Sequence, residues 1–351
     1  MSAAPPSSIL VIRLSALGDV AMASGLIPAL RSAYPNARLA WLTEPAAAPL
    51  LRANPRLDEL LIWDRPSWRR MWKERRYADL WRAWREFRQQ LRAGRYDLVI
   101  DAQGLLKSGL CAWWTGAPRR LGLHPREGSQ WLMTERFEPH PTARPQIGSE
   151  YRQLAAHLGA PEHAFRLDVV PSDQARRAAQ EALARSGVAT PYAALCPFTT
   201  RPQKHWFPDR WAALAQRLRD EGITPVLLGG PADHAAALDI LHQHGAPAAD
   251  LVGQLRLDES AAVIQGASLL IGVDTGLTHI GTAMRVPTVA LFGSTRPYLS
   301  AGEAPTRVMY EALPCSPCRR HPTCGGRFDC MRAHSVDAVA REARTIMETA
   351  R

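Results

Sequence analysis

The stretch that decides the fold runs from residue 267 to residue 284 and reads A-S-L-L-I-G-V-D-T-G-L-T-H-I-G-T-A-M. Its apolar first part predicts a buried strand, and residues 280–284 predict the first turns of a helix. Between them, residues 273–279 (V-D-T-G-L-T-H) form a polar turn around Gly276. A strand, a tight turn and a helix in this order predict an α/β unit.

The same turn has the chemistry of a phosphate site. A helix start presents unpaired backbone N–H groups and the positive end of the helix dipole, and Gly276 lets a ligand approach the backbone. Side chains that can contact sugar hydroxyls and phosphate oxygens are those of Asp274, Thr275, Thr278 and His279. The alternative is an ordinary turn in which Asp274 or Thr275 only caps the helix.

Strands and helices alternate along the whole chain, which predicts an α/β fold with parallel sheets. The predicted strands cover residues 8–14, 38–42, 59–63 and 97–101, then 192–195, 224–228, 269–272 and 288–292. The predicted helices cover residues 20–32 with a break or kink at Pro28, then 105–114, 209–221, 233–243, 258–265 and 335–349. The two series predict domains over residues 1–170 and 171–334 and a C-terminal helix over 335–351. We expect the domains to face each other across a cleft that holds ligands at the strand ends.

Composition narrows the class of protein. The chain has 351 residues, 46% of them hydrophobic, and no apolar run approaches the roughly 20 residues that span a bilayer. Residues 1–8 have no basic region that would indicate a secretion signal, so we expect a cytoplasmic protein. A net charge of +10 predicts an acidic partner, such as nucleic acid, an anionic membrane or a phosphorylated substrate.

Much of the positive charge lies between Arg65 and Arg95, where eleven basic residues stand against three acidic ones. Helical spacing of Trp84, Phe87 and Leu91 predicts that these three side chains belong to the core. The portion from Trp68 to Arg76, which includes Arg69 and Arg70, has the Trp-rich basic character of a surface for an anionic membrane or an acidic acceptor.

Two loops at strand ends carry candidate catalytic groups. Residues 15–19 (S-A-L-G-D) are not G-x-G-x-x-G, which disfavours a nicotinamide cofactor. Asp19 there is either a general base or an N-cap. Residues 198–206 combine hydroxyls, cations and Trp206, and suit a diphosphate: Lys204 as a point charge, Thr199 or Thr200 as hydrogen-bond donors. A solvated basic loop is the alternative.

Four cysteines cluster near the C-terminus. Cys315, Cys318, Cys324 and Cys330 form C-x2-C-x5-C-x5-C. In a cytoplasmic protein this clustering favours metal over disulfides, and four thiolates can hold structural zinc or iron. The spacing is not that of a standard zinc ribbon, so free or transiently oxidised thiols remain the alternative. Cys111 and Cys196 are expected to be ordinary buried thiols.

Four motifs in this order resemble glycosyltransferase family 9, the ADP-heptose:lipopolysaccharide heptosyltransferases. They are R-L-S-A-L-G-D-V (13–20), I-D-A-Q-G-L-L-K-S (100–108), T-T-R-P-Q-K-H-W (199–206) and V-D-T-G-L-T-H (273–279), and the resemblance spans residues 9–297. The second motif is most similar to that of the heptosyltransferase I members. The cysteine cluster departs from the simplest pattern of those members and is similar to heptosyltransferase II-like tails.

The resemblance implies a GT-B fold of two Rossmann-like domains, the first binding the acceptor and the second the nucleotide sugar. It implies inverting, metal-independent transfer of heptose from ADP-heptose to the Kdo/heptose inner core on lipid A, at the inner face of the inner membrane. Asp19 would be the base, and Arg13 and Lys107 would face the acceptor. Thr200 and Lys204 would hold the donor diphosphate, and backbone N–H groups of Thr275, Gly276 and Leu277 would bind its phosphate. Asp233 would contact the ribose and Asp274 the heptose hydroxyls. His279 would lie near the donor.

Two other classes of function remain as alternatives. Another GT-B transferase or a sugar-nucleotide epimerase shares the plan, but an epimerase has no need of the basic Trp-rich segment. A nucleic-acid binder is suggested by the charge and the cysteines. However, the charge is concentrated in one helical segment and no nucleic-acid recognition motif is present, so we expect no nucleic-acid partner.

Overall fold

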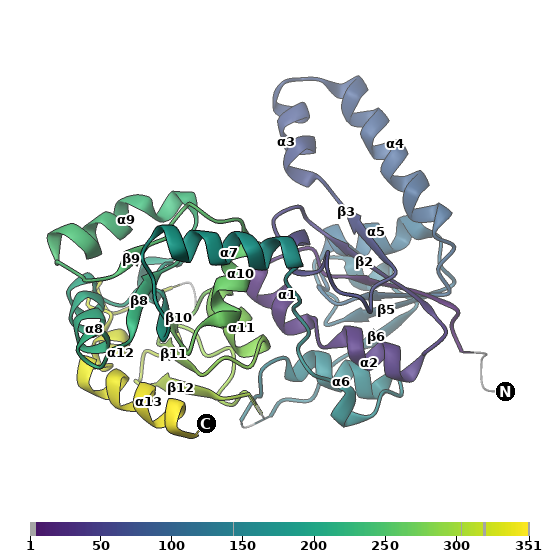
Figure 1. Ribbon diagram of the computed structural model, residues 1–351. Helices are drawn as coiled ribbons and strands as arrows, with labels where there is room; N and C mark the ends of the chain where they lie inside the picture. The colour runs from purple at the N-terminus through teal and green to yellow at the C-terminus, as the bar shows by residue number, and fades with distance from the viewer. Residues whose placement is uncertain (1–4, 143, 303, 319–320, 350–351) are drawn as a thin grey trace. The chain divides into compact units, whose positions relative to one another are not determined.

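The computed structural model describes residues 5–142, 144–302, 304–318 and 321–349 (Figure 1). The chain forms two compact units. The first contains residues Met1–Pro141 and Gly148–Val170, and the second contains Thr142–Ile147 and Pro171–Arg351. The short segment 142–147 therefore belongs to the second unit although the chain on both sides of it belongs to the first.

The first unit is built on a six-stranded sheet in the order β3-β2-β1-β4-β5-β6, with every pair parallel. Its strands are β1 (Ser8–Ile12), β2 (Arg38–Thr43), β3 (Glu59–Ile62), β4 (Leu98–Asp101), β5 (Arg119–Leu123) and β6 (Glu135–Phe137). β1 and β4 are buried along their whole length, as expected for a parallel sheet covered on both faces.

Helices cover both faces of this sheet. They are α1 (Leu17–Ala23), α2 (Leu26–Ala33), α3 (Arg65–Lys73), α4 (Tyr77–Ala93), α5 (Leu106–Thr115) and α6 (Ser149–His157). On one face, Phe87 and Leu91 of α4 and Cys111 of α5 pack on strand residues such as Leu10 and Val99. α3 buries no residue, and the helical hairpin of α3 and α4 projects from the sheet (Figure 1).

The second unit repeats the plan with the order β12-β11-β10-β7-β8-β9. Its strands are β7 (Tyr192–Cys196), β8 (Thr224–Leu227), β9 (Ala249–Asp250), β10 (Leu269–Val273), β11 (Thr288–Phe292) and β12 (Thr306–Tyr310). Counted from its own first strand, each sheet has the order 3-2-1-4-5-6 of a Rossmann fold. Residues 269–283 form the central strand β10, a turn and the helix that follows it.

The helices of the second unit are α7 (Asp173–Arg185), α8 (Pro208–Asp220), α9 (His234–Leu238), α10 (Leu257–Gly266), α11 (Gly276–Ala283), α12 (Asp329–Arg332) and α13 (Val336–Thr349). Trp206, Trp211 of α8 and Val339 of α13 pack in one core with Leu227 and Ile271 of the sheet. α13 thus completes the core of the second unit. As predicted, Ser335 caps α13, because its hydroxyl accepts from the Ala338 N–H at 3.2 Å.

The helix predicted over residues 20–32 breaks at a different place from the predicted Pro28. The chain ends α1 at Ala23 and starts α2 at Leu26, and Pro28 lies within the first turn of α2. Proline is tolerated there because an N–H in the first turn has no partner within the helix. Gly25 marks the break, and a Cβ on it would come within 2.6 Å of the Phe165 ring.

The predicted helix over 233–243 is irregular. Pro231–Asp233 forms a 3-10 turn, α9 follows, and Asp239–Gln243 continues as a π-helix. No helix within the described ranges is long and apolar enough to cross a bilayer.

Candidate active site

Strand order decides where each unit can bind a ligand. In each sheet the order reverses between two central strands, β1 and β4 in the first unit and β7 and β10 in the second. Loops after those strands separate at this point and leave a crevice at the carboxyl edge of an open α/β sheet. Asp19 and Lys107 follow β1 and β4, and Lys204 and Asp274 follow β7 and β10.

Asp19 is the third residue of α1 and half-exposed at its side chain. Its Oδ2 accepts from the Ala16 N–H at 3.3 Å and pairs with Nη2 of Arg13 at 2.5 Å. Both contacts use one carboxylate oxygen, so Oδ1 has no recorded partner among the described residues. Asp19 therefore caps its helix and still offers an oxygen to a ligand.

Arg13 is buried and its guanidinium is already engaged. Besides Asp19, it donates from Nη1 to the Ala102 carbonyl at 2.9 Å and lies over the Tyr151 ring at 5.8 Å. Burial opposes its charge, but nearby Tyr151, Asp19 and Glu150 leave the pKa of Arg13 raised. Arg13 thus lies where it positions Asp19, and its predicted contact with the acceptor stays a prediction.

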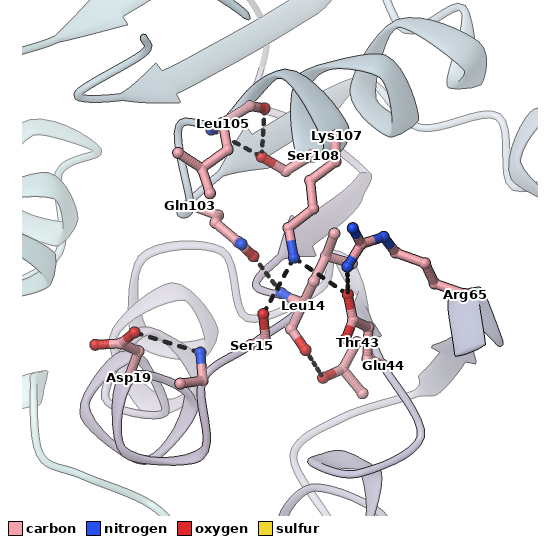
Figure 2. A network of polar contacts seen from close by, with 11 residues as sticks. Leu14, Ser15, Asp19, Thr43, Glu44, Arg65, Gln103, Leu105, Lys107 and Ser108 are labelled. Atoms are coloured by element: carbon pink, nitrogen blue, oxygen red, sulfur yellow. Dashed lines mark hydrogen bonds and ion pairs between the residues drawn. The ribbon is translucent and has the colours of Figure 1, made fainter. Parts of the chain in front are cut away.

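Lys107, on α5, reaches back to the loops after β1 and β2 (Figure 2). Its Nζ lies 3.2 Å from Oγ of Ser15 and 3.2 Å from Oε1 of Glu44. Arg65, the first residue of α3, lies 3.5 Å from the same Glu44 oxygen. This network connects the loop before Asp19 to the start of the basic helix α3. Arg69 and Arg70 are exposed one turn along that helix.

Asp101, the last residue of β4, holds the loop that carries Lys107. Its carboxylate accepts from the N–H groups of Gln103 and Gly104 at 3.0 and 3.1 Å and from Oγ of Ser108 at 3.0 Å. Burial raises the pKa of Asp101 to about 6, and these hydrogen bonds only partly oppose that shift. Gln103 in turn accepts the Leu14 N–H at 2.9 Å, which joins the β1 and β4 loops (Figure 2).

In the second unit, Asp274 is the centre of a buried polar cluster. Its carboxylate lies 2.6 Å from Nζ of Lys204 and 3.3 Å from Nε2 of His279, and it accepts from the Thr295 hydroxyl. Burial alone would raise the pKa of Asp274. The hydrogen bond and charge of His279 and the charge of Lys204 overcome burial and lower that pKa. Asp274 is thus held as a carboxylate. Tyr298 fixes the other side of the imidazole, with its hydroxyl 3.1 Å from Nδ1 of His279.

The helix that follows, α11, starts beside this cluster with its first turn open. Thr275 is the N-cap but its side chain makes no capping hydrogen bond, and the first turn has no acidic residue. Backbone N–H groups of Gly276 and Leu277 are therefore available to an anion. The Thr278 hydroxyl donates instead to the Val273 carbonyl at 2.7 Å, so it has a structural role.

The loop after β7 is tied to the same cluster. Oγ1 of Thr199 lies 3.4 Å from the Asp274 carbonyl, and Nε2 of His205 lies 2.8 Å from the Thr199 carbonyl. Thr200 is exposed at the tip of the loop. The structure thus brings Thr199, Lys204, Asp274 and His279 together, as the motifs suggested.

Asp233 belongs to a separate loop of the second unit. Its Oδ2 accepts the Gly230 N–H at 2.8 Å and so closes the turn that precedes α9. A role at a ribose stays a prediction.

The four clustered cysteines are free thiols. Partial burial, with a smaller contribution from neighbouring thiols, raises the pKa values of Cys318 and Cys330. Within the part of the chain that the structure describes, no three His, Cys, Asp or Glu side chains are arranged to hold a metal ion. As placed, the thiols do not fit a tetrahedral metal, and the zinc or iron site stays a prediction from spacing.

Several polar residues of these networks escaped the sequence analysis: Glu44, Asp101, Thr295 and Tyr298. Glu44 directly follows β2 and Thr295 follows β11 by three residues. The rule that singled out Asp19 and Asp274, a polar side chain just after a buried strand, would have found both. Tyr298 had no such signal.

Two tryptophans of the basic segment differ from their predicted roles. Phe87 and Leu91 are buried as predicted, but Trp84 is only half-buried and packs edge-on against Trp114. Trp68 packs edge-on against Trp63 and Phe87, with ring centroids 5.5 and 5.6 Å apart. It anchors α3 to the sheet and is not part of a free surface. Trp72 is 63% exposed, and Arg69, Arg70 and Arg75 are exposed around it.

Comparisons with known proteins agree on one family. The model for "Glycosyltransferase family 9 (heptosyltransferase)" matches residues 84–326. Lipopolysaccharide heptosyltransferase 1 of Pseudomonas aeruginosa is 31% identical over 320 residues, which cover 88% of this chain and 85% of that protein.

Solved structures share the fold. A family 9 glycosyl transferase from Veillonella parvula superposes with a TM-score of 0.81 at 22% identity, covering 98% of this chain and 97% of the other. The Escherichia coli heptosyltransferase WaaC, solved with ADP-2-deoxy-2-fluoro heptose, gives 0.71 at 24% identity, covering 96% and 99%. The predicted GT-B plan of two Rossmann-like units is confirmed. With the family model matching most of its length, the chain belongs to glycosyltransferase family 9, the heptosyltransferases.

Proposed function

We propose that this enzyme transfers heptose from ADP-heptose to the Kdo/heptose inner core of lipopolysaccharide, with inversion at the anomeric carbon. The observation that carries the proposal is the cluster of half-buried Lys204 with buried Asp274 and His279 beside the open N-terminus of α11. The cluster combines a cation and free backbone N–H groups for a diphosphate with a carboxylate for sugar hydroxyls. The family and the names of its relatives support the same substrates.

On the donor side, the leaving group is ADP. Lys204 and the N–H groups of Gly276 and Leu277 would stabilise the charge that grows on the diphosphate as the glycosidic bond breaks. Asp274, kept ionised by Lys204 and His279, would accept hydrogen bonds from heptose hydroxyls. Thr199 and Thr200 would add hydroxyl donors, and Asp233 would contact the ribose.

On the acceptor side, Asp19 would act as the general base through its Oδ1. It would take the proton from the acceptor hydroxyl while that oxygen forms the new bond to the anomeric carbon. The bond from that carbon to the diphosphate oxygen breaks, and ADP leaves with the electron pair. Arg13 and the Ala16 N–H hold Oδ2, so Oδ1 points in a fixed direction.

The acceptor carries phosphates and carboxylates, and the first unit has cations that suit them. Lys107 lies in the network next to Ser15, and Arg69 and Arg70 are exposed on α3. We place the enzyme in the cytoplasm, bound peripherally at the inner face of the inner membrane, where the lipid A–Kdo acceptor would be met.

The proposed transfer needs no metal, because protein cations and a helix N-terminus would stabilise the negative charge on the leaving diphosphate. Turnover is therefore expected to survive EDTA. A loss of activity that Mg²⁺ restores, with the fold intact, would refute this. Loss of thermal stability together with zinc or iron released from the protein would instead identify a structural metal at the cysteine cluster.

The test of the mechanism is Asp19→Asn. Asparagine can still accept the Ala16 N–H, so the cap of α1 is kept, but it is a poor base. We expect kcat to fall at least ~100-fold while ADP affinity and melting temperature hardly change. Product is measured by mass spectrometry with ADP-heptose and Kdo-lipid A as substrates.

A matched control is Asp173→Asn, which changes an exposed acid at the start of α7. Near-normal turnover of the Asp19→Asn enzyme would show that Asp19 is only a cap. Mass spectrometry of lipopolysaccharide from a deletion strain distinguishes addition of the first heptose from addition of the second, because the core truncates at a different size.

A further inference from the structure

One face of α4 carries arginines that have no acidic partner. Arg85, Arg88 and Arg92 follow each other at helical spacing, and Arg95 continues the row just beyond the helix. Within the described ranges none of these four forms an ion pair. Arg76 and Arg82, at the start of the same helix, do pair with Asp79. The row therefore keeps its positive charge unneutralised.

Three hollows lie along this row and share its residues. One of about 280 Å³ is lined by Trp84, Arg85, Arg88, Gln89 and Arg92. A second of about 150 Å³ is lined by Arg88, Arg92, Trp113, Trp114, Gly116 and Arg120. A third of about 430 Å³ includes Arg92, Arg95, Tyr96 and Asp97 in its lining. Arg92 lines all three, so the hollows adjoin at its side chain. Together they are called the depression between α4, the end of α5 and the start of β5.

Two guanidinium groups of this depression are set up for an anion. Nε of Arg88 is buried and has no hydrogen-bond partner within the described residues. An unmet buried donor is costly, so this arginine gains no compensation from a protein acceptor at Nε. Arg120 is held in place by hydrogen bonds to the carbonyls of Leu132 and Ala117 at 2.8 and 2.5 Å.

Acidic side chains are few beside this row. Of the residues that line the three hollows, only Asp97 is acidic. Its carboxylate already accepts from the hydroxyl and N–H of Ser7 and from the N–H of Ser8. Glu86 lies on α4 among the row and is exposed, and it forms no ion pair with a described residue.

Tryptophans flank the arginines. Trp84 packs edge-on against Trp114, and the guanidinium of Arg88 lies 5.6 Å from the centre of the Trp84 ring. Trp113 is 51% exposed, and Trp81, which Arg85 covers on one side, is 58% exposed. Exposed tryptophan next to arginine is the composition of a surface that sits at a water–lipid interface, where the ring is buried and the cation meets a phosphate.

The depression is remote from the candidate catalytic residues of its own sheet. α4 leads into β4 and α5 leads into β5, so their C-terminal ends lie at the edge where these strands begin. Asp19 and Lys107 follow β1 and β4 and lie at the opposite, carboxyl edge. The unpaired arginines therefore do not serve the acceptor subsite proposed around Asp19.

We propose that this depression binds the phosphates of anionic phospholipid headgroups and seats the first unit on a membrane. Arg88, Arg92 and Arg120 would contact the phosphate. Arg85 and Arg95 would add electrostatic attraction to the anionic surface. Trp81 and Trp113 would insert into the headgroup layer. A lipid fits better than a free phosphate because a bilayer would bury the exposed apolar surface of the tryptophans, and a soluble anion would not. The site takes no part in heptose transfer and can be tested without either substrate.

The test is co-sedimentation of the full chain with vesicles of phosphatidylcholine alone or with about a third phosphatidylglycerol. The variant carries Arg85→Gln, Arg92→Gln and Arg95→Gln, three exposed positions where folding should be unaffected. The control carries Arg177→Gln, Arg219→Gln and Arg341→Gln, which remove the same charge from exposed positions of the second unit. We expect the first variant to lose at least ~10-fold in affinity for anionic vesicles and the control to lose less than about threefold.

A second pair of measurements fixes the ligand class. Trp113→Ala should weaken vesicle binding by several-fold without changing its salt dependence, since it removes no charge. Equal losses in both triple variants would overturn the proposal, because only net charge would then matter. If glycerol phosphate binds as tightly as the vesicles, the ligand is a soluble phosphate and the proposal is overturned. If a short single-stranded DNA binds more tightly than the vesicles, and the first triple variant loses that binding, the ligand is a nucleic acid and the proposal is also overturned.

The outcome is separable from that of the proposed function. Vesicle binding needs neither ADP-heptose nor acceptor, so it can succeed even if no heptose is transferred. Conversely, the first triple variant should transfer heptose to a water-soluble, delipidated acceptor at the wild-type rate. A drop there would place the depression in the acceptor site and contradict the assignment.

Discussion

At the scale of single residues, the donor and acceptor candidates are each held by an oppositely charged neighbour. Lys204 holds Asp274, and Arg13 holds Asp19. His279 and Lys204 lower the pKa of Asp274 against the effect of burial, so that buried carboxylate stays ionised. In Asp19 the pair also leaves one carboxylate oxygen, Oδ1, without a partner among the described residues, as a general base requires.

Lys204→Ala is expected to weaken ADP binding by about 1.5–3 kcal/mol, because a charge-assisted contact to the diphosphate is lost. Calorimetry measures this directly. The matched control is Lys107→Ala, a lysine of the first unit that is expected to leave ADP affinity unchanged. Unchanged affinity in the Lys204 variant would place the diphosphate away from the loop after β7.

Asp101 makes the unfolding free energy depend on pH. Its pKa is raised by burial to about 6, whereas an unfolded aspartate titrates near ~3.9. Between these values the native state holds a proton that the unfolded state has lost, so stability falls as pH rises from about 4 to about 6. The full cost above that window is about 3 kcal/mol at most.

Asp101→Asn removes this titration and keeps acceptor and donor atoms for the loop. Relative to wild type, the variant should therefore gain stability between about pH 4 and pH 6 and keep the gain at higher pH. Urea unfolding at several pH values measures the difference. A difference that does not vary with pH would show that Asp101 does not titrate in this range.

At the scale of elements, the strand–turn–helix of residues 267–284 depends on tight packing between β10 and α11. A Cβ on Gly272 would collide with the Thr278 hydroxyl and come within 3.0 Å of the Cys196 Cβ. Thr278 is fully buried and bonded to the Val273 carbonyl, so it cannot move aside without losing that bond.

Gly272→Ala is accordingly expected to lower the unfolding free energy by about 1–3 kcal/mol through overpacking. Gly230→Ala is the matched control. It lies exposed in a loop of the same unit, and its added methyl would meet only the Asp233 carboxylate at 3.7 Å. If both variants melt alike, the contact between β10 and α11 is not tightly packed.

The elements that could be predicted from the sequence are those in which almost every residue is apolar. β7, β10 and β11 are fully buried apolar runs, and the sequence placed each within a residue or so of its bounds. β5 was missed because Arg119 and Arg120 open it, and β6 because it has only three residues. The break between α1 and α2 was misplaced because Gly25 is required by a contact with Phe165, far away in sequence.

The candidate site shows the same division. Asp274 directly follows the central strand β10, and Asp19 and Lys204 lie in the segments that follow β1 and β7, so their position in the chain predicted their edge of the sheet. That Arg13 would hold Asp19 and Tyr298 would hold His279 depends on which loops meet, and that follows only from the strand order. The local sequence carries no signal for it.

At the scale of the whole molecule, positive charge is concentrated on the first unit. Neutralising Arg69, Arg70 and Arg75 on and after α3 is expected to raise the KM for the acceptor, each charge contributing about 1 kcal/mol or less. Added salt should have the same effect, because these side chains are exposed. The KM for ADP-heptose should hardly change, since the donor cluster belongs to the second unit. A rise in donor KM with unchanged acceptor KM would contradict this role for α3.

The segment 142–147 has a consequence for how the protein is made. It joins the second unit through Gln146, which forms a bridge with Ser300, and through Ile147, whose N–H donates to the Ser300 carbonyl at 2.8 Å. On a ribosome, Ser300 emerges only after about 150 further residues, or roughly 8–30 s at ordinary elongation rates. The first unit, whose last residue is Val170, can fold in that interval while this segment waits. Because of the order of synthesis, the first unit can be folded while segment 142–147 still lacks its pairing partner. The segment pairs with Ser300 only after most of the second unit has been translated.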